Sequence, residues 1–147
     1  INKCLKSSRK GDCSHDPDPM AEWDVSNVRD LSRQFGNAIT FNGDISKWDV
    51  SSVTSTSRMF ILATLFNRDL SKWDVSSVVS MDYMFFYAKS YNHKLCGASW
   101  VNSKASRKDM FTGSPGSISQ TVCATKFLSR LELEDGRIYT GHFSLMR

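Results

Sequence analysis

The sequence has no long uninterrupted hydrophobic run and no strong excess of charge of one sign. Hydrophobic residues make up 40% of the 147 residues, but no apolar stretch approaches the roughly 20 residues that a membrane-spanning helix requires. The net charge is +4, and residues 21–100 carry as many Asp and Glu as Lys and Arg. A nucleic-acid-binding protein would show basic residues recurring along one face. We therefore expect neither a membrane span nor a nucleic-acid partner.

Residues suited to catalysis are equally scarce. The three histidines, His15, His93 and His142, lie in separate segments, and no glycine-rich phosphate loop is present. One carboxylate recurs at fixed spacing, at Asp24, Asp49 and Asp74. Capping of a helix start explains that column better than metal binding or acid–base chemistry. The sequence thus predicts a protein that is not an enzyme and that holds no cofactor and no metal.

What the sequence does contain is a 25-residue period. Residues 23–47, 48–72 and 73–97 align beneath one another without a gap. The columns that coincide include Trp23, Trp48 and Trp73; Phe35, Phe60 and Phe85; Ala38, Ala63 and Ala88; and Asn42, Asn67 and Asn92. A fourth, degenerate copy runs from Trp100 to Phe111 after a shift of one or two residues.

Each repeat is interpreted as one helix and one short strand. The apolar positions of the second copy fall close to the spacing of one helical face, at Val53, Met59, Phe60 and Ala63. An aromatic-Asn pair and a branched residue follow, as in Phe66-Asn67 with Leu70, and predict a strand of about four residues. The predicted fold is an α/β repeat solenoid in which parallel strands are joined by right-handed crossovers.

Two sets of residues that recur at the same position of each repeat, one of Asn and one of Trp, are interpreted as structural. An inward Asn can bond backbone groups of its own coil and the next, so Asn42, Asn67 and Asn92 are expected to satisfy amides inside the fold. Trp23, Trp48 and Trp73 are expected to fill a core layer, because the large indole surface favours burial.

These residues carry a family resemblance. The segment FNGDISKWDVSSV, followed by RMF and Ala63, resembles the BspA-type leucine-rich repeat, a mycoplasma lipoprotein-associated repeat of unknown function. The resemblance covers residues 20–97 strongly and 98–113 weakly. It implies a leucine-rich-repeat-like solenoid used for protein contact, found in bacterial surface proteins and in marine algae, with no catalytic residues. Gln34 and Thr56 depart from the pattern, since Met or Leu is usual there.

A second departure indicates a binding surface. After the Phe of each helix the family often has small or polar residues, and the first copy has Gly36 and Asn37. Later copies carry large apolar residues instead, at Ile61, Leu62, Leu65, Phe86 and Tyr87. If adjacent repeats stack, these residues form one exposed apolar patch, which is typical of an interface. The alternative is that a small rotation buries them beneath neighbouring turns.

The ends are interpreted as caps, which cover the outer layers of a stack. The expected divisions of this single domain are an N-terminal cap over residues 1–22, three repeats over 23–97, a degenerate repeat over 98–118 and a hairpin cap over 119–147. In the last of these, Leu131 and Leu133 alternate with polar residues, Asp135-Gly136 supplies a turn and Ile138 begins the return strand. The tail could instead insert into a partner.

The four cysteines, Cys4, Cys13, Cys96 and Cys123, allow three disulfide connectivities. A disulfide between Cys4 and Cys13 would tie down the leader in an oxidising compartment, and Cys96 could pair with Cys123. A zinc site with Cys4, Cys13 and His15 is the rival, but the spacing matches no standard ligand pattern.

Two functions fit the sequence. One is a scaffold or recognition module, secreted or displayed at a cell surface, that binds another protein. The other is an accessory or linker subunit of a large membrane-bound organellar assembly, such as an algal photosystem-antenna complex at the thylakoid. A permanent subunit should aggregate when expressed alone, whereas a free module should stay monomeric. A surface of regular Ser and Thr for ice or carbohydrate is weaker, because only Thr54, Thr56 and Thr64 cluster.

Overall fold

The computed structural model of this chain describes residues 19–124, 128–132 and 138–142. Its elements are the 3-10 helix η1 (Met20–Glu22), strand β1 (Lys94–Leu95), helix α2 (Ala98–Val101) and strands β2 (Ser117–Ile118), β3 (Leu128–Glu132) and β4 (Ile138–His142). Most of the described chain between η1 and β1 consists of turns and extended segments. The regular elements therefore do not by themselves define the architecture.

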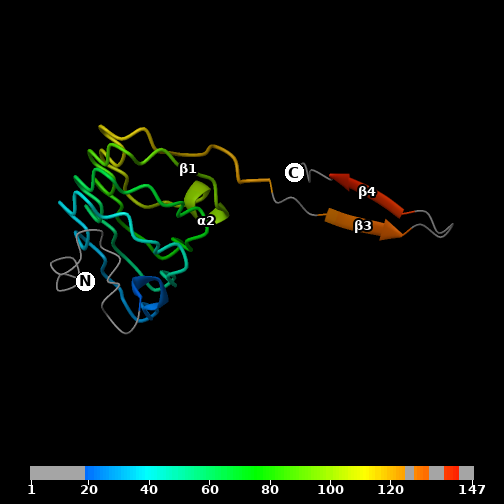
Figure 1. Ribbon diagram of the computed structural model, residues 1–147, viewed down its shortest axis with the longest axis horizontal. Helices are drawn as coiled ribbons and strands as arrows, with labels where there is room; N and C mark the ends of the chain where they lie inside the picture. The colour runs from blue at the N-terminus through cyan, green and yellow to red at the C-terminus, as the bar shows by residue number, and fades with distance from the viewer. Residues whose placement is uncertain (1–18, 125–127, 133–137, 143–147) are drawn as a thin grey trace.

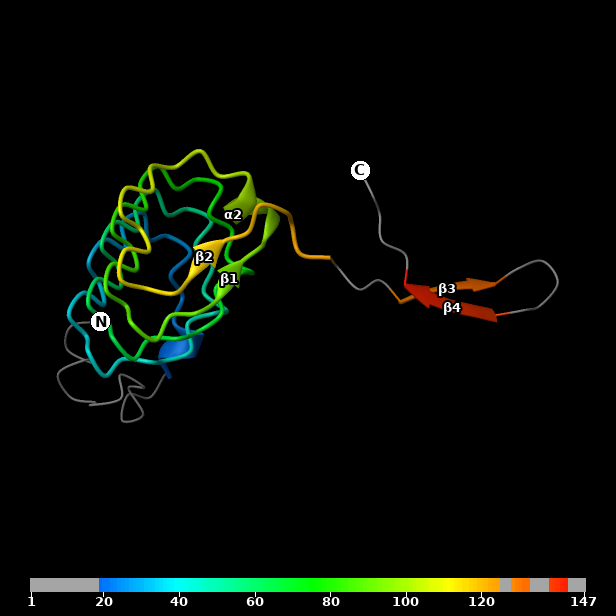
Figure 2. The ribbon, with the colours of Figure 1, turned by 90° about the horizontal axis from the view of Figure 1, so that it is seen from above.

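The architecture is a stack of coils, visible as superposed loops in Figures 1 and 2. We name the coils by the repeats: coil 1 (23–47), coil 2 (48–72), coil 3 (73–97) and coil 4 (98–118). Parallel bridges connect them in order, through Asp30, Ser55, Ser80 and Ser106. A further parallel pair, β1 with β2, joins coils 3 and 4. Each coil thus lies beside its counterpart in the next repeat.

One side of each coil is a ribbon of successive turns, over residues 32–37, 57–62 and 82–87. In coil 2 the N–H groups of Met59, Ile61 and Ala63 donate to carbonyls three residues earlier in the same coil. The N–H groups between them, on Phe60 and Leu62, donate to carbonyls of coil 3. Half of the amides in this ribbon therefore bond within the coil and half bond between coils.

The helix predicted in each repeat is not formed. In an α-helix every interior N–H bonds within its own segment, whereas this ribbon sends alternate N–H groups to the neighbouring coil. Left-handed backbone conformations at Arg58 (φ 58°) and Leu62 (φ 59°) would also interrupt any helix. Asp49 accordingly caps no helix. Its Oδ1 accepts the Ser51 N–H at 3.0 Å in a local turn, and Asp24 and Asp74 do the same with Ser26 and Ser76.

The strands predicted after each aromatic-Asn pair are largely absent as well. Residues 41–45 and 66–70 form no strand, and the third copy supplies only the two residues of β1. The coils are instead linked there by side chains. Asn42 Oδ1 accepts the Asn67 N–H at 2.9 Å, and Asn67 Oδ1 accepts the Asn92 N–H at 3.2 Å.

Two columns of aromatic rings fill the interior. Phe35, Phe60 and Phe85 stack with ring centroids 5.5 and 5.4 Å apart, and Phe111 of coil 4 continues the column at 5.4 Å. The 25-residue period implies that equivalent residues lie one coil apart, and these phenylalanines do so in direct ring contact. A second column runs through Phe41, Phe66 and Tyr91 at 5.6 and 5.8 Å. Burial of such rings supplies most of the driving force for stacking the coils.

Indole N–H groups link three coils to earlier segments of the chain, and for Trp48 that segment is η1. The Trp48 Nε1–H donates to the Met20 carbonyl at 2.8 Å, Trp73 to Ile45 at 3.1 Å and Trp100 to Leu70 at 2.8 Å. Trp48, Trp73 and Trp100 are buried, and Trp23 packs against the core while stacking on Trp48 at 6.5 Å. Each buried tryptophan therefore contributes apolar area and satisfies a carbonyl of an earlier segment.

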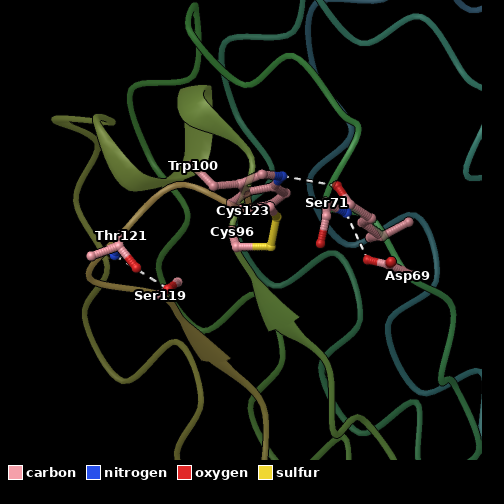
Figure 3. The surroundings of a disulfide bond; sticks show 8 residues. Asp69, Ser71, Cys96, Trp100, Ser119, Thr121 and Cys123 are labelled. Carbon is pink, nitrogen blue, oxygen red and sulfur yellow. Dashed lines mark hydrogen bonds between the residues drawn. A yellow bond between two sulfur atoms is a disulfide. The ribbon is translucent and has the colours of Figure 1, made fainter. Parts of the chain in front are cut away.

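Coil 4 departs from the 25-residue period at one corner (Figure 3). Trp100 follows Trp73 by 27 residues, and α2 takes up the extra length. Gly97 precedes α2, and a Cβ there would lie 2.1 Å from the Ser71 carbonyl oxygen, so this corner requires glycine. A disulfide joins Cys96 to Cys123, and the Cys123 N–H donates to the Cys96 carbonyl.

The two ends of the stack expose different backbone groups. At the coil 4 end the N–H groups of Arg107, Asp109, Phe111 and Gly113 have no acceptor within the described residues. At the coil 1 end the carbonyls of Asp30, Ser32, Gln34 and Gly36 accept no backbone N–H from them. In the interior of the stack the equivalent groups bond to each other. Along the ribbon, one end is therefore a row of donors and the other a row of acceptors, whereas bonds outside it, such as the Thr54 N–H to the Arg29 carbonyl, run the opposite way.

Strands β3 and β4 form the antiparallel hairpin predicted from the sequence, with Leu128 opposite His142 and Glu132 opposite Ile138. Leu133 and the expected Asp135-Gly136 turn lie outside the described residues. The hairpin is drawn apart from the coils in Figures 1 and 2. Its role as a cap stays a prediction.

Candidate partner-binding strip

The five apolar residues singled out in the sequence come from adjacent turns of coils 2 and 3. Leu62, Leu65 and Tyr87 are exposed, at 40%, 52% and 42% of their surface. Ile61 and Phe86 are half-buried. The Leu62 N–H donates to the Phe86 carbonyl at 2.9 Å, which places the two coils side by side at this point. We name this surface the apolar strip and define it by these five residues.

The strip occupies backbone positions that do not suit large side chains. Leu62 and Tyr87 have φ values of 59° and 53°, in the left-handed region, and their counterpart in coil 1 is Asn37 at 62°. Asn adopts this conformation readily, whereas other L-residues pay roughly 1–2 kcal/mol for it. Backbone geometry alone therefore favours Asn or Gly at all three positions. Partial burial of Leu62 and Tyr87 offsets this cost only in part, and about two fifths of each residue stays exposed to solvent.

Glycines in neighbouring coils make room for the strip. A Cβ built on Gly36 would lie 3.1 Å from Ile61 Cγ2, and one built on Gly113 would lie 2.9 Å from the Tyr87 ring. The Ile61 side chain thus lies against coil 1, and the Tyr87 ring lies against coil 4. Two side chains of the strip are therefore packed against the coils on either side of it.

Two further residues lie beside the strip, and they were not predicted from the sequence. Ile39 of coil 1 is 59% exposed, and its carbonyl accepts the Leu65 N–H at 3.2 Å. Tyr83 packs edge-on to Phe86 with ring centroids 5.6 Å apart. Both were missed because their columns contain other residue types in other coils, so no repeated signal marked them.

Cations border the strip at Tyr83. The Arg58 guanidinium lies 4.9 Å from the centre of the Tyr83 ring, and Lys108 Nζ lies 5.8 Å from it. Both distances fit a cation–π interaction. The Tyr83 hydroxyl beside Lys108 raises the pKa of that ammonium group. Arg33, the counterpart of Arg58 in coil 1, is exposed. The edge of the strip beside Tyr83, which we call its flank, therefore carries positive charge in coils 1, 2 and 4.

Carboxylates on the same flank are already hydrogen-bonded. Asp82 Oδ1 accepts the Ser106 hydroxyl and the Lys108 N–H, and these bonds lower the pKa of Asp82. Asp109 Oδ1 accepts the Thr112 hydroxyl at 3.2 Å. These neutral donors do not cancel the charge of a carboxylate, so Asp82 and Asp109 offset part of the positive charge of Lys108, whose pKa they help to raise.

The remaining predicted site residues lie elsewhere. The side chains of Asn42 and Asn67 accept the inter-coil bonds described above, whereas Asn92 contributes only its backbone N–H and is exposed, so its expected place inside the fold is wrong. Cys4, Cys13 and His15, proposed as a disulfide or a zinc site, lie outside the described residues. Within residues 19–124, 128–132 and 138–142, no group of His, Cys, Asp and Glu could hold a metal ion. In that same part of the chain, no helix is long and apolar enough to cross a membrane.

A buried hydroxyl lies in coil 2, one residue before the ribbon of turns. Thr56 is fully buried in the position that Leu31 occupies in coil 1 and Met81 in coil 3, and its Oγ1 has no hydrogen-bond partner. The sequence analysis identified Thr56 as a departure from the repeat. The structure shows its consequence, an unsatisfied polar atom in the interior.

A family model described as "Mycoplasma protein of unknown function, DUF285" matches residues 6–123. The chain belongs to that family. The match spans the four coils and ends at the disulfide-bonded Cys123. No curated protein and no solved structure matches the chain. The DUF285 repeat is related to the BspA-type repeat inferred from the sequence.

Proposed function

We propose that this DUF285 protein is a non-enzymatic interaction module that binds another protein through the apolar strip. In this proposal the stacked coils are a solenoid of the leucine-rich-repeat-like, BspA-type class, and their regularity serves to present the strip on a rigid support. The observation that carries the proposal is the pair Leu62 and Tyr87. Both are large, exposed apolar residues at left-handed backbone positions.

Leu62 and Tyr87 carry backbone strain that the fold does not require. Folding alone would favour Asn at positions 62 and 87, as at Asn37, because Asn relieves the backbone strain and exposes no apolar surface. Strained residues that the fold does not require are typical of functional surfaces. Exposed aromatic and leucine side chains are also the residues that a partner can desolvate with the largest gain.

The alternative, a permanent subunit of a large membrane-bound assembly, uses the same strip. It differs in how the isolated chain behaves, because a permanent interface is larger and more hydrophobic than a transient one. A monodisperse monomer in light scattering would favour the free module. Aggregation that the strip substitutions suppress would favour the subunit.

The test compares the natural chain with Leu62→Asn/Tyr87→Asn, which gives coils 2 and 3 the residue found in coil 1. Relief of strain should offset the lost burial, so the free energy of unfolding should change by less than about 1 kcal/mol. Val79→Thr is the matched control. Val79 is 71% exposed but lies outside the strip, and its counterpart in coil 2 is Thr54.

Each immobilised variant is exposed to extract from the source cells, and bound proteins are quantified by mass spectrometry. We expect a set of proteins that the natural chain and Val79→Thr retain equally and that the double variant loses at least tenfold. Equal retention by all three chains would contradict the proposal.

A further inference from the structure

We infer that the strip accepts an amphipathic α-helix whose apolar face is flanked by acidic residues. The inference rests on the proposed function and adds the chemistry and shape of the partner. Its observations are the spacing of the coils, the partial burial of the strip's side chains and the charge along one flank.

The spacing of the coils matches the pitch of a helix. Neighbouring coils are about 5 Å apart, as paired strands are, and stacked rings in the interior are 5.4 to 5.8 Å apart. An α-helix advances 5.4 Å per turn. A helix lying along the stack would therefore place one apolar residue per turn against successive coils, at Ile39, Leu62 and Tyr87. Residues at positions i, i+3 or i+4, and i+7 would make these contacts.

The flank of the strip selects the charge of that helix. Arg58 and Lys108 lie over the Tyr83 ring, and Arg33 continues the flank in coil 1. Asp82 and Asp109 place two negative charges beside Lys108, so an acidic edge of the helix is matched mainly to Arg33 and Arg58, in coils 1 and 2. Acidic side chains on one edge of the helix would meet these cations, and basic ones would be repelled. Lys89, exposed two residues after Tyr87, adds a cation beyond the apolar residues.

A protein helix fits this surface better than a lipid bilayer does. Side chains that insert into a membrane interface project from the surface, whereas Ile61 and Phe86 are half-buried and even Leu65 is only 52% exposed. Contacts with Gly36 and Gly113 hold Ile61 and Tyr87 against the neighbouring coils. The strip is thus a surface of partly buried side chains packed against neighbouring coils, which suits another folded element.

The experiment uses three synthetic peptides of about 18 residues, or five helical turns. The first has a leucine face flanked by Glu, the second has the same face flanked by Lys, and the third has the Glu flank with its leucines scrambled around the helix. Affinities for the full chain are measured by fluorescence anisotropy at low and physiological salt. Vesicles with equal parts of phosphatidylcholine and phosphatidylserine serve as the membrane arm.

We expect the Glu-flanked peptide to bind about tenfold more tightly than the Lys-flanked one, since several weak ion pairs replace several repulsions. The preference should shrink at higher salt. Arg58→Glu should reduce or reverse it without unfolding the chain, Leu62→Asn/Tyr87→Asn should abolish binding of both peptides, and Val79→Thr should change neither.

The outcomes separate this inference from the proposed function. If both peptides bind equally and the double variant loses them, the preference for acidic partners is wrong but the strip still binds protein. If no peptide binds while the strip-dependent capture from extract succeeds, the helical partner is wrong. Binding of the scrambled peptide as tightly as the first, or strip-dependent binding to vesicles alone, would also overturn the inference.

Discussion

The interior of the stack and its outer strip are built on the same backbone but follow different rules. Inside, one residue type recurs from coil to coil, as in Phe35, Phe60 and Phe85, because each ring must stack on the next. On the strip the same backbone position carries Asn37, then Leu62, then Tyr87. All three adopt the left-handed conformation. The conformation is therefore set by the coil, while the side chain is not.

This difference shows where the fold constrains the sequence. A change in one interior column removes contacts with two neighbouring coils, so uniformity there is enforced by packing. A change on the strip affects mainly solvent and, as proposed above, a partner. Variation at a position whose backbone geometry is fixed is thus a guide to function in a repeat protein.

Among changes that compare the interior with the strip, Phe60→Ala should have the largest effect on the free energy of unfolding. The Phe60 ring stacks on Phe35, Phe66 and Phe85 and is fully buried. Removing it leaves a cavity in the centre of the column, and the free energy of unfolding should fall by about 3–5 kcal/mol. Urea denaturation followed by tryptophan fluorescence measures the loss. A loss no larger than that of Leu62→Asn/Tyr87→Asn would erase the distinction between the two regions.

A smaller effect of opposite sign is expected from Thr56→Val. Valine keeps the shape of threonine and removes the buried hydroxyl that has no partner. The unfolding free energy should rise by about 1 kcal/mol. Thermal unfolding monitored by circular dichroism provides the measurement, and Thr54→Val, at an exposed hydroxyl that donates to the Arg29 carbonyl, serves as the control. A destabilised Thr56→Val variant would mean that this hydroxyl is bonded in solution.

The smallest effect concerns the carboxylates of Asp24, Asp49 and Asp74. Hydrogen bonds from the Ser two residues later lower the pKa of each, and the folded pKa lies below the ordinary value of 3.8. A lowered pKa stabilises the fold above the unfolded value, and this contribution is lost as the pH falls through the folded pKa. Unfolding free energy should therefore decline below about pH 4.

The matched variant carries Asn at all three of these positions, because Asn accepts the same backbone hydrogen bond without titrating. Its stability should depend less on pH in the acidic range than that of the natural chain. Parallel urea titrations between neutral and acidic pH compare the two. Identical pH profiles would assign the acid sensitivity to other carboxylates.

The stacking of the repeats could be predicted from the sequence, but the conformation inside each repeat could not. A column such as Phe35, Phe60 and Phe85 implies equivalent environments whatever the local structure. The apolar spacing of Val53, Met59 and Phe60 fits a helix and a ribbon of turns equally well. What decides between them is the hydrogen bonding of alternate amides to the next coil, and periodicity carries no information about that.

Only part of the candidate site could be predicted from the sequence. Leu62, Leu65 and Tyr87 were recognised because they differ from the small or polar residues of coil 1, and the structure exposes them. Ile61 and Phe86 are less exposed than the simple stacking argument implies, because Ile61 lies against Gly36 of coil 1 and Phe86 packs on Tyr83 and Tyr87 of its own coil. Tyr83 and its two cations join residues from three coils, and only the three-dimensional arrangement brings them together.

Within the described residues, the ribbon of turns ends in a row of N–H groups without an acceptor on coil 4 and in a row of carbonyls that accept no backbone N–H on coil 1, which gives the ribbon a polarity. Two identical ends placed face to face would oppose donor to donor or acceptor to acceptor, so neither end can pair with its own kind through these rows. Only a coil arriving in the same orientation could continue the hydrogen bonding. A protein of this kind can therefore be lengthened only by whole repeats added in the same orientation. Each added repeat would extend any surface that the coils share by the same distance.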